Sequence, residues 1–256
     1  MLFLRKHIEV KQHIPNILTL LNVFSGCLAV LFAVWNHWEV MAFFVFLGLF
    51  FDFFDGLSAR VLKVQSSLGI QLDSLADMIT FGLVPGIVMF QLLTMSETGG
   101  WNLKITETMN WVSFRGLLPF FGFAITLSSA YRLARFNIDE NQATSFIGLP
   151  TPANALLVIS LPLILMFNGN DALNSIILNP WFLIVLTVVS SLLLNAPIPL
   201  FALKFKTWDF KDNALRYIFI FVSLVFIGTM KFLAIPAIIV FYLLSSFLLP
   251  HEEKKA

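Results

Sequence analysis

The chain has 256 residues, of which 58% are hydrophobic and only 12% are charged. Soluble domains carry about 25% charged residues, so soluble, disordered, fibrous and disulfide-stapled proteins are excluded. A net charge of +1 gives no indication of nucleic-acid binding. The single cysteine, Cys27, cannot build a disulfide framework or a Cys-based zinc site. We therefore expect an all-α polytopic membrane protein.

Eight apolar segments approach the roughly 20 residues that a membrane-spanning helix needs. In chain order they are Ile17–Val34, Val40–Phe54, Gly69–Leu93, Phe114–Leu133, Ala153–Phe167, Trp181–Leu203, Ala214–Met230 and Phe232–Leu249. The fifth is short, and little more than Lys231 separates the last two, so we expect six to eight spans.

Residues 1–256 are expected to form a single membrane domain. Residues 1–14 mix apolar and basic side chains, which is typical of an interfacial segment on anionic membrane lipids or of a plain basic anchor. With eight spans, most Lys and Arg residues fall on the side of the N-terminus. This bias predicts a protein of the cell (inner) membrane with both termini in the cytoplasm.

Four aspartates lie close together in the sequence: Asp52, Asp55, Asp73 and Asp77. Spacings of i, i+3 and i, i+4 put each pair on one helix face. The second and third spans run antiparallel through the short connection Gly56–Leu68, so we expect the four carboxylates to meet at the cytoplasmic interface. Oxygen ligands without His or Cys select hard cations, and two Mg²⁺ or Mn²⁺ ions would balance four negative charges.

The residues between these aspartates favour a diphosphate ligand. Gly56 and Gly69 leave room for a ligand near the backbone, Arg60 suits phosphate oxygens, and Ser66 can donate a hydroxyl. Two other interpretations are aspartates that only cap helices or set topology, and a proton or cation relay. Capping needs one aspartate rather than four, and a relay needs acidic partners deeper in other spans.

The pattern Asp52-x2-Asp55-Gly56-x2-Ala59-Arg60-x8-Gly69-x3-Asp73-x3-Asp77 resembles the signature of the CDP-alcohol phosphotransferase family, with all eight fixed positions matched. Further stretches resemble the integral-membrane members that use serine as acceptor. These stretches are Pro15–Thr19, Leu72–Asp77, Arg132–Asn137 and Gly148–Ala153.

The resemblance implies that Asp52 and Asp73 bridge two metal ions, that Asp55 completes the shell of the first ion, and that Asp77 completes that of the second. It also implies that Asp77 is the general base and that the protein is a homodimer. The residues that it implies for binding of the CDP group are Asn16, Thr19, Gly56, Arg60 and Ser66.

The reaction implied by the resemblance converts CDP-diacylglycerol and L-serine into phosphatidylserine and CMP. Arg132 and Arg135, at the inner end of the fourth span, are expected to contact the serine carboxylate or a lipid phosphate, or to be only positive-inside residues. Two other functions stay open. One is a related transferase whose acceptor is glycerol phosphate or inositol phosphate, and the other is a divalent-cation transporter.

Overall fold

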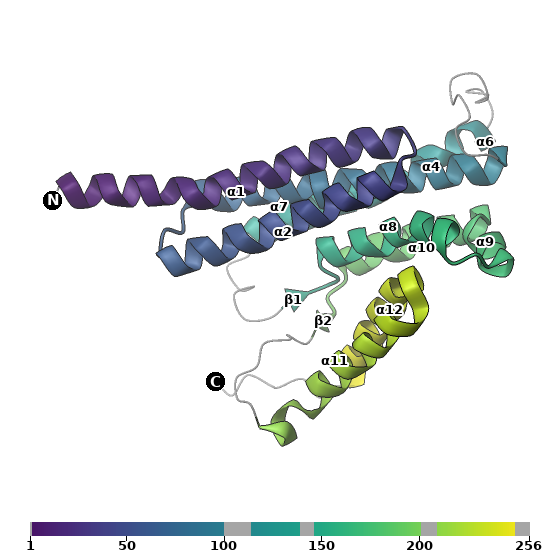
Figure 1. Ribbon diagram of the computed structural model, residues 1–256. Helices are drawn as coiled ribbons and strands as arrows, with labels where there is room; N and C mark the ends of the chain where they lie inside the picture. The colour runs from purple at the N-terminus through teal and green to yellow at the C-terminus, as the bar shows by residue number, and fades with distance from the viewer. Residues whose placement is uncertain (1, 100–113, 139–145, 201–208, 249–256) are drawn as a thin grey trace.

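The computed structural model describes residues 2–99, 114–138, 146–200 and 209–248, which are almost entirely helical (Figure 1). The elements in chain order are α1 (Leu2–Val34), α2 (Trp38–Leu62), α3 (Ser67–Asp77), the π-helical turn η1 (Met78–Leu83), α4 (Val84–Thr98), α6 (Phe114–Leu117), the 3₁₀ segment η2 (Leu118–Phe123), α7 (Ala124–Ile138), β1 (Phe146–Ile147), α8 (Thr151–Phe167), α9 (Asp171–Ile177), α10 (Pro180–Asn195), β2 (Pro199–Leu200), α11 (Phe210–Met230), the 3₁₀ turn η4 (Lys231–Leu233) and α12 (Ala234–Leu248).

Local signals in the sequence explain several of these boundaries. The backbone of Lys63 is left-handed, with φ 54°, and ends α2, and the Ser66 side chain caps α3 by accepting a hydrogen bond from Gly69 N. Asn179 caps α10 in the same way, and Pro180 occupies the first turn, where a missing N–H is tolerated. Consequently only residues 63–66 separate α2 from α3.

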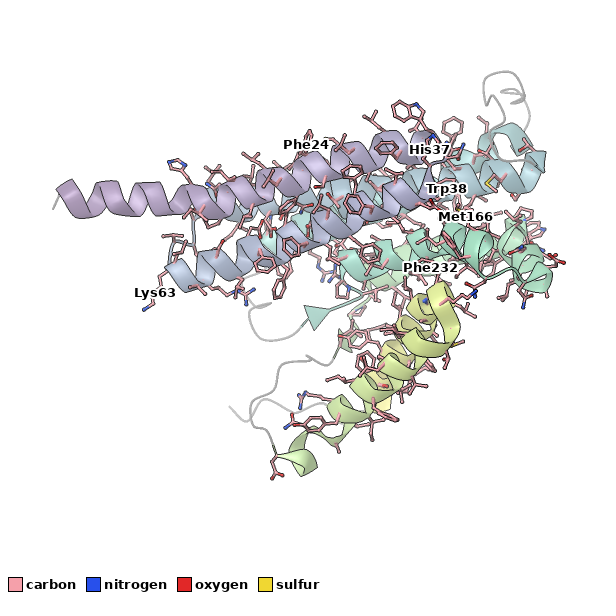
Figure 2. The ribbon with its side chains drawn as sticks, viewed as in Figure 1. Phe24, His37, Trp38, Lys63, Met166 and Phe232 are labelled. Atoms are coloured by element: carbon pink, nitrogen blue, oxygen red, sulfur yellow. The ribbon has the colours of Figure 1, made fainter. Side chains whose placement is uncertain are left out.

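The centre of the bundle is α4, which contacts α1, α7, α8 and α10. Its side chains from Val84 to Met95 are almost all buried, and Val88, Met89 and Leu92 are fully so. Helices α1 and α2 form a long antiparallel hairpin beside it, with Trp38 at the beginning of α2 and Lys63 just beyond its end (Figure 2). The core therefore runs along the bundle and is thickest around α4.

Helices α11 and α12 pack against each other and fold back at Lys231, whose φ is 50°. Figure 1 shows this pair beside α8, at the edge of the bundle. Large apolar side chains are exposed along the outer helices: Leu127, Leu192 and Phe221 expose 71%, 65% and 68% of their surface. Apolar exposure on this scale is typical of helices that face lipid.

Four stretches of the described chain are long and apolar enough to cross a membrane, and the bent pair α9 and α10 would make a fifth. The four are His13–Val34, Trp38–Leu62, Ser67–Thr98 and Asn213–Ser246, the last of which holds both α11 and α12. The prediction of an all-α, membrane-embedded protein is therefore confirmed. The number of spans, six to eight, stays a prediction.

Two boundaries differ from the sequence-based expectation. The predicted connection Gly56–Leu68 is mostly helix, because α2 continues through good helix formers as far as Leu62. The sixth segment was expected to reach Leu203, but α10 ends at Asn195, shortly before Pro197 and Pro199. Helix α1 is continuous from Leu2, so residues 2–14 extend the helix of the first span, and their interfacial role stays a prediction.

Candidate active site

The candidate site lies where α2 and α3 meet at the turn 63–66. Asp52 and Asp55 come from the second half of α2, and Asp73 comes from α3. Each of these three aspartates offers one carboxylate oxygen, and the three oxygens lie within 4.8 Å of one another. Among the described residues, this is the one group of three or more acidic, His or Cys side chains close enough to share an ion.

Asp77 lies on the last turn of α3 and belongs to the same set of charges. Its carboxylate contacts Asp52 and lies close to Asp73 and Asp55. The oxygen Oδ1 of Asp77 is buried and has no hydrogen-bond partner within the described part of the chain. The predicted meeting of the four carboxylates is therefore present in the structure.

These four side chains fit a divalent cation. No Lys, Arg or His among the described residues forms an ion pair with any of them, so their negative charge has no cationic partner in the part of the chain that the structure describes. Carboxylates near hydrocarbon are normally paired or bound to a cation. An all-oxygen donor set with one orphaned buried oxygen suits Mg²⁺ or Mn²⁺ better than zinc.

A cavity of about 250 Å³ opens beside the carboxylates and is bounded by α1, α2 and α3. Asp55 and Asp73 belong both to its wall and to the carboxylate cluster. All five residues predicted for CDP binding line it, together with residues that the sequence did not single out for this role. The full lining is Pro15, Asn16, Thr19, Asp55, Gly56, Ala59, Arg60, Val64, Gln65, Ser66, Gly69, Ile70 and Asp73.

Hydrogen bonds hold the polar side chains of this cavity in place. The Thr19 hydroxyl, on α1, donates to Asp55 Oδ2 at 2.5 Å. Arg60 Nε donates to the carbonyl of Gly56 at 3.0 Å, one turn back on α2. Because Nε is used in this way and Arg60 has no other partner in the described chain, its two Nη groups are free to donate to a ligand.

The first turn of α3 forms another wall of the cavity. Ser66 Oγ accepts a hydrogen bond from Gly69 N at 3.0 Å, which leaves the hydroxyl proton free for a ligand. A Cβ at position 69 would lie 3.2 Å from Ser66 Oγ and 3.5 Å from Asn16 Oδ1, so glycine allows these two groups to approach the backbone. The N-terminus of a helix carries partial positive charge and favours phosphate oxygens.

The two arginines predicted to contact the acceptor lie on α7, and neither lines the cavity. Arg132 Nη1 donates to the carbonyl of Leu194 and so ties α7 to the last turn of α10. Arg135 is exposed and has no polar partner within the described ranges. The structure thus gives Arg132 an internal contact, and an acceptor contact for either residue stays a prediction.

A contact that the sequence did not predict joins α7 to α3. Ser74 Oγ donates to Asn137 Oδ1 at 3.1 Å, and Asn137 Nδ2 donates to Gln71 Oε1 at 3.2 Å. Ser74 directly follows Asp73, so this contact fixes α7 against the carboxylate-bearing helix. Asn137 ends one of the stretches that carry the family resemblance, but its partners could not be derived from the sequence.

The profile of the CDP-alcohol phosphatidyltransferase family matches residues 12–193, which include every residue of the candidate site. The chain belongs to this family. The match confirms the resemblance predicted from the aspartate signature, and makes the chain a phosphatidyltransferase of phospholipid synthesis.

Three relatives of this phosphatidyltransferase are named CDP-diacylglycerol–serine O-phosphatidyltransferase. The Bacillus subtilis protein is 30% identical over 169 residues, which are 64% of this chain and 81% of the relative. The Helicobacter pylori protein (strain 26695) is 32% identical over 225 residues, 86% of this chain and 84% of the relative. The Saccharomyces cerevisiae protein is 32% identical over 165 residues, 58% of this chain, and the chain spans only 53% of its length.

Proposed function

We propose that this protein transfers the phosphatidyl group of CDP-diacylglycerol to the hydroxyl of L-serine, giving phosphatidylserine and CMP. The names of the bacterial and yeast relatives support this choice of substrates. The observation that carries the proposal is the cavity between α1, α2 and α3, which is lined both by side chains suited to phosphate and by two of the clustered carboxylates.

Asp52, Asp55, Asp73 and Asp77 would hold two Mg²⁺ or Mn²⁺ ions, with Asp52 and Asp73 shared between them. When bound, such ions neutralise a diphosphate and stabilise the oxygen of the departing nucleotide. The geometry of the donor atoms supports this proposal. Three carboxylate oxygens lie within 4.8 Å of one another, and Asp77 adds a buried oxygen without a partner in the described chain.

The CDP group would occupy the cavity of about 250 Å³. The free Nη groups of Arg60 and the hydroxyl proton of Ser66 would donate to the diphosphate oxygens. Asn16 would add its carboxamide from α1, and Gly56 would leave its backbone open to the ligand. Thr19 would lie beside the ligand in the cavity wall, and its hydroxyl would hold the Asp55 carboxylate in place.

The proton of the serine hydroxyl would pass to Asp77, which is the general base of this proposal. The serine oxygen then forms a bond to the phosphatidyl phosphorus, and the bond from that phosphorus to the CMP oxygen breaks. The position of Asp77 on the last turn of α3, in contact with Asp52, supports a role next to the reacting phosphate. Arg135 would bind the serine carboxylate from the end of α7.

The site would face the cytoplasm, and the protein would lie in the cell's inner membrane as a homodimer. Figure 1 shows that the beginning of α1 and the turn between α2 and α3 lie at the same end of the bundle. Because basic residues are concentrated at this end of the predicted spans, we infer that it is the cytoplasmic one. Soluble serine and CMP could then exchange with the cytoplasm while the acyl chains stay in the bilayer.

A comparison of acceptors tests the proposal. Purified protein in lipid nanodiscs is incubated with CDP-diacylglycerol, Mg²⁺ and labelled serine, glycerol phosphate or inositol phosphate, and labelled lipid is counted. We expect serine to be incorporated at least tenfold faster than either phosphate. Preference for glycerol phosphate or inositol phosphate would assign the chain to another acceptor, and absence of labelled lipid with all three would contradict the transferase reaction itself.

A further inference from the structure

A second polar layer lies one helical turn deeper in the bundle than the carboxylates. Its members are Asn22 on α1 and Thr80 on η1, and both are completely or almost completely buried. The Thr80 hydroxyl lies 2.8 Å from Asn22 Oδ1 and 3.3 Å from the Asn22 carbonyl. Neither residue lines the cavity, and neither belongs to the family signature considered above.

The sequence positions place this layer next to the carboxylate site, one helical turn further from the turn 63–66. Thr80 follows Asp77 by three residues, and Asn22 follows Thr19, the partner of Asp55, by three residues. On α2, Gly48 precedes Asp52 by four residues, and a Cβ at Gly48 would lie 2.9 Å from Asn22 Oδ1. Asn22 and Thr80 therefore lie about one turn away from the site on their own segments, and Gly48 of α2 packs against them.

Close packing holds this layer rigidly. A Cβ at Gly26, on α1, would collide with the Thr80 hydroxyl, and a Cβ at Gly48 would also come within 2.8 Å of the Thr80 methyl group. Small residues allow helix backbones to approach in this way. Thr80 moreover sits within the π-helical turn that begins directly after Asp77. Single π-helical turns are frequent at functional sites, and here the Thr80 hydroxyl ties the turn to Asn22 on α1.

The deeper layer also has an unused donor. Asn22 Nδ2 is buried and has no hydrogen-bond partner within the described chain, and Asp77 Oδ1 is buried and has none either. The first atom is a donor and the second an acceptor, and no hydrogen bond joins them within the described chain. An unpaired buried donor is costly unless it serves a ligand or a charged neighbour.

We propose that Asn22 and Thr80 form a positioning pair, which fixes η1 to α1 and thereby holds the Asp77 carboxylate in its place in the metal and proton-transfer site. The inference rests on the proposed role of Asp77. It predicts that the pair acts on divalent-ion affinity and on turnover, while the binding of both substrates is left nearly unchanged.

The test uses full-length protein in nanodiscs with four substitutions. Thr80→Val keeps the shape of threonine without the hydroxyl, Thr80→Ser keeps the hydroxyl, and Asn22→Ala removes the partner. Asn154→Ala is the matched control, because Asn154 is equally buried and accepts a hydrogen bond from Ser190 at 2.7 Å on α8 and α10. Mn²⁺ affinity is measured by electron paramagnetic resonance, and kcat and KM by labelled-serine incorporation.

We expect Thr80→Val and Asn22→Ala to weaken Mn²⁺ binding and lower kcat by about 10- to 100-fold, the range found when residues that orient metal ligands are replaced. Both KM values should stay within about twofold, and Thr80→Ser and Asn154→Ala should resemble the wild type in Mn²⁺ affinity. Unchanged Mn²⁺ affinity in Thr80→Val, or an equal loss in Asn154→Ala, would overturn the inference. If Thr80→Val does not fold, Asn22→Ala decides in the same way.

The Mn²⁺ measurement does not depend on the acceptor. A wild-type protein that binds Mn²⁺ but transfers nothing to serine would contradict the proposed function, while the variants would still decide whether the positioning pair exists.

Discussion

The Thr19 hydroxyl donates a hydrogen bond to Asp55 Oδ2 at 2.5 Å, and this bond joins α1 to α2 at the wall of the cavity. Both side chains are buried, with 3% and 5% of their surface exposed, although both also border the cavity. The bond explains why a residue of the first helix belongs to a site whose charges all come from the next two helices. It also suggests how the first span controls the geometry of the carboxylates.

Replacement of Thr19 tests this connection. Thr19→Val keeps the shape of the side chain but removes the donor to Asp55, and a buried hydrogen bond to a charged group contributes about 1.5–3 kcal/mol. We expect the Mg²⁺ concentration for half-maximal activity to rise about tenfold or more. Thr19→Ser, which keeps the hydroxyl, is the control and should stay near the wild type. A Mg²⁺ dependence in Thr19→Val that equals that of the wild type would show that the bond does not support metal binding.

Arg60 offers a test of the diphosphate position. Its Nε is held by the Gly56 carbonyl, so only the two Nη groups face a ligand. Arg60→Lys keeps the charge but loses the planar pair of donors, and we expect the KM for CDP-diacylglycerol to rise about tenfold or more with little change in the KM for serine. Lys63→Arg, one turn further along and outside the cavity lining, is the control. Equal KM values in Arg60→Lys and the wild type would remove Arg60 from the binding site.

Asp77 is expected to separate catalysis from binding. Asp77→Asn cannot accept a proton, so we expect turnover to fall by about 10²-fold or more, the usual contribution of a general base. Asp52, Asp55 and Asp73 remain, and we expect CDP-diacylglycerol binding, measured by equilibrium titration, to change only a few-fold. The control is Asp171→Asn, an exposed aspartate in the first turn of α9. A wild-type rate in Asp77→Asn would refute its role as base.

The two arginines of α7 should behave differently. Arg132 donates to the Leu194 carbonyl, so Arg132→Ala is expected to lower the melting temperature. Arg135 is exposed and free of such contacts, so Arg135→Lys should leave the melting temperature unchanged and raise the KM for serine about 10- to 100-fold. A rise in the KM for CDP-diacylglycerol instead would place Arg135 on a lipid phosphate. Changes below about twofold in both KM values would make it only a positive-inside residue.

Much of the candidate site could be predicted from the sequence because it depends on local geometry. The spacing of Asp52 with Asp55, and of Asp73 with Asp77, places each pair on one helix face wherever a helix forms. Since α2 and α3 are joined by a turn as short as residues 63–66, the ends of the two helices that carry the aspartates lie near each other. The prediction of a shared carboxylate site therefore did not require knowledge of how the rest of the bundle packs.

The remaining contacts depend on which helices pack side by side, and this the sequence does not reveal. Nothing in the spacing of Asn22 and Thr80, or of Ser74 and Asn137, indicates that they touch, because each pair joins elements distant in the chain. Helix ends were also misjudged where hydrophobicity was the guide. Helix α2 continues beyond its apolar part to Leu62, where Leu57, Ala59, Arg60 and Leu62 are good helix formers.

The central claim is that the carboxylate cluster on α2 and α3 transfers the phosphatidyl group to serine with the help of divalent ions. The most direct test measures CMP and phosphatidylserine together, in one reaction of purified protein with CDP-diacylglycerol and serine, before and after chelation and then after Mg²⁺ is restored. We predict equal amounts of the two products, loss of both in chelator, and recovery of both with Mg²⁺. Phosphatidylserine formation that continues undiminished in chelator would contradict the metal site, and CMP release without phosphatidylserine would contradict serine as the acceptor.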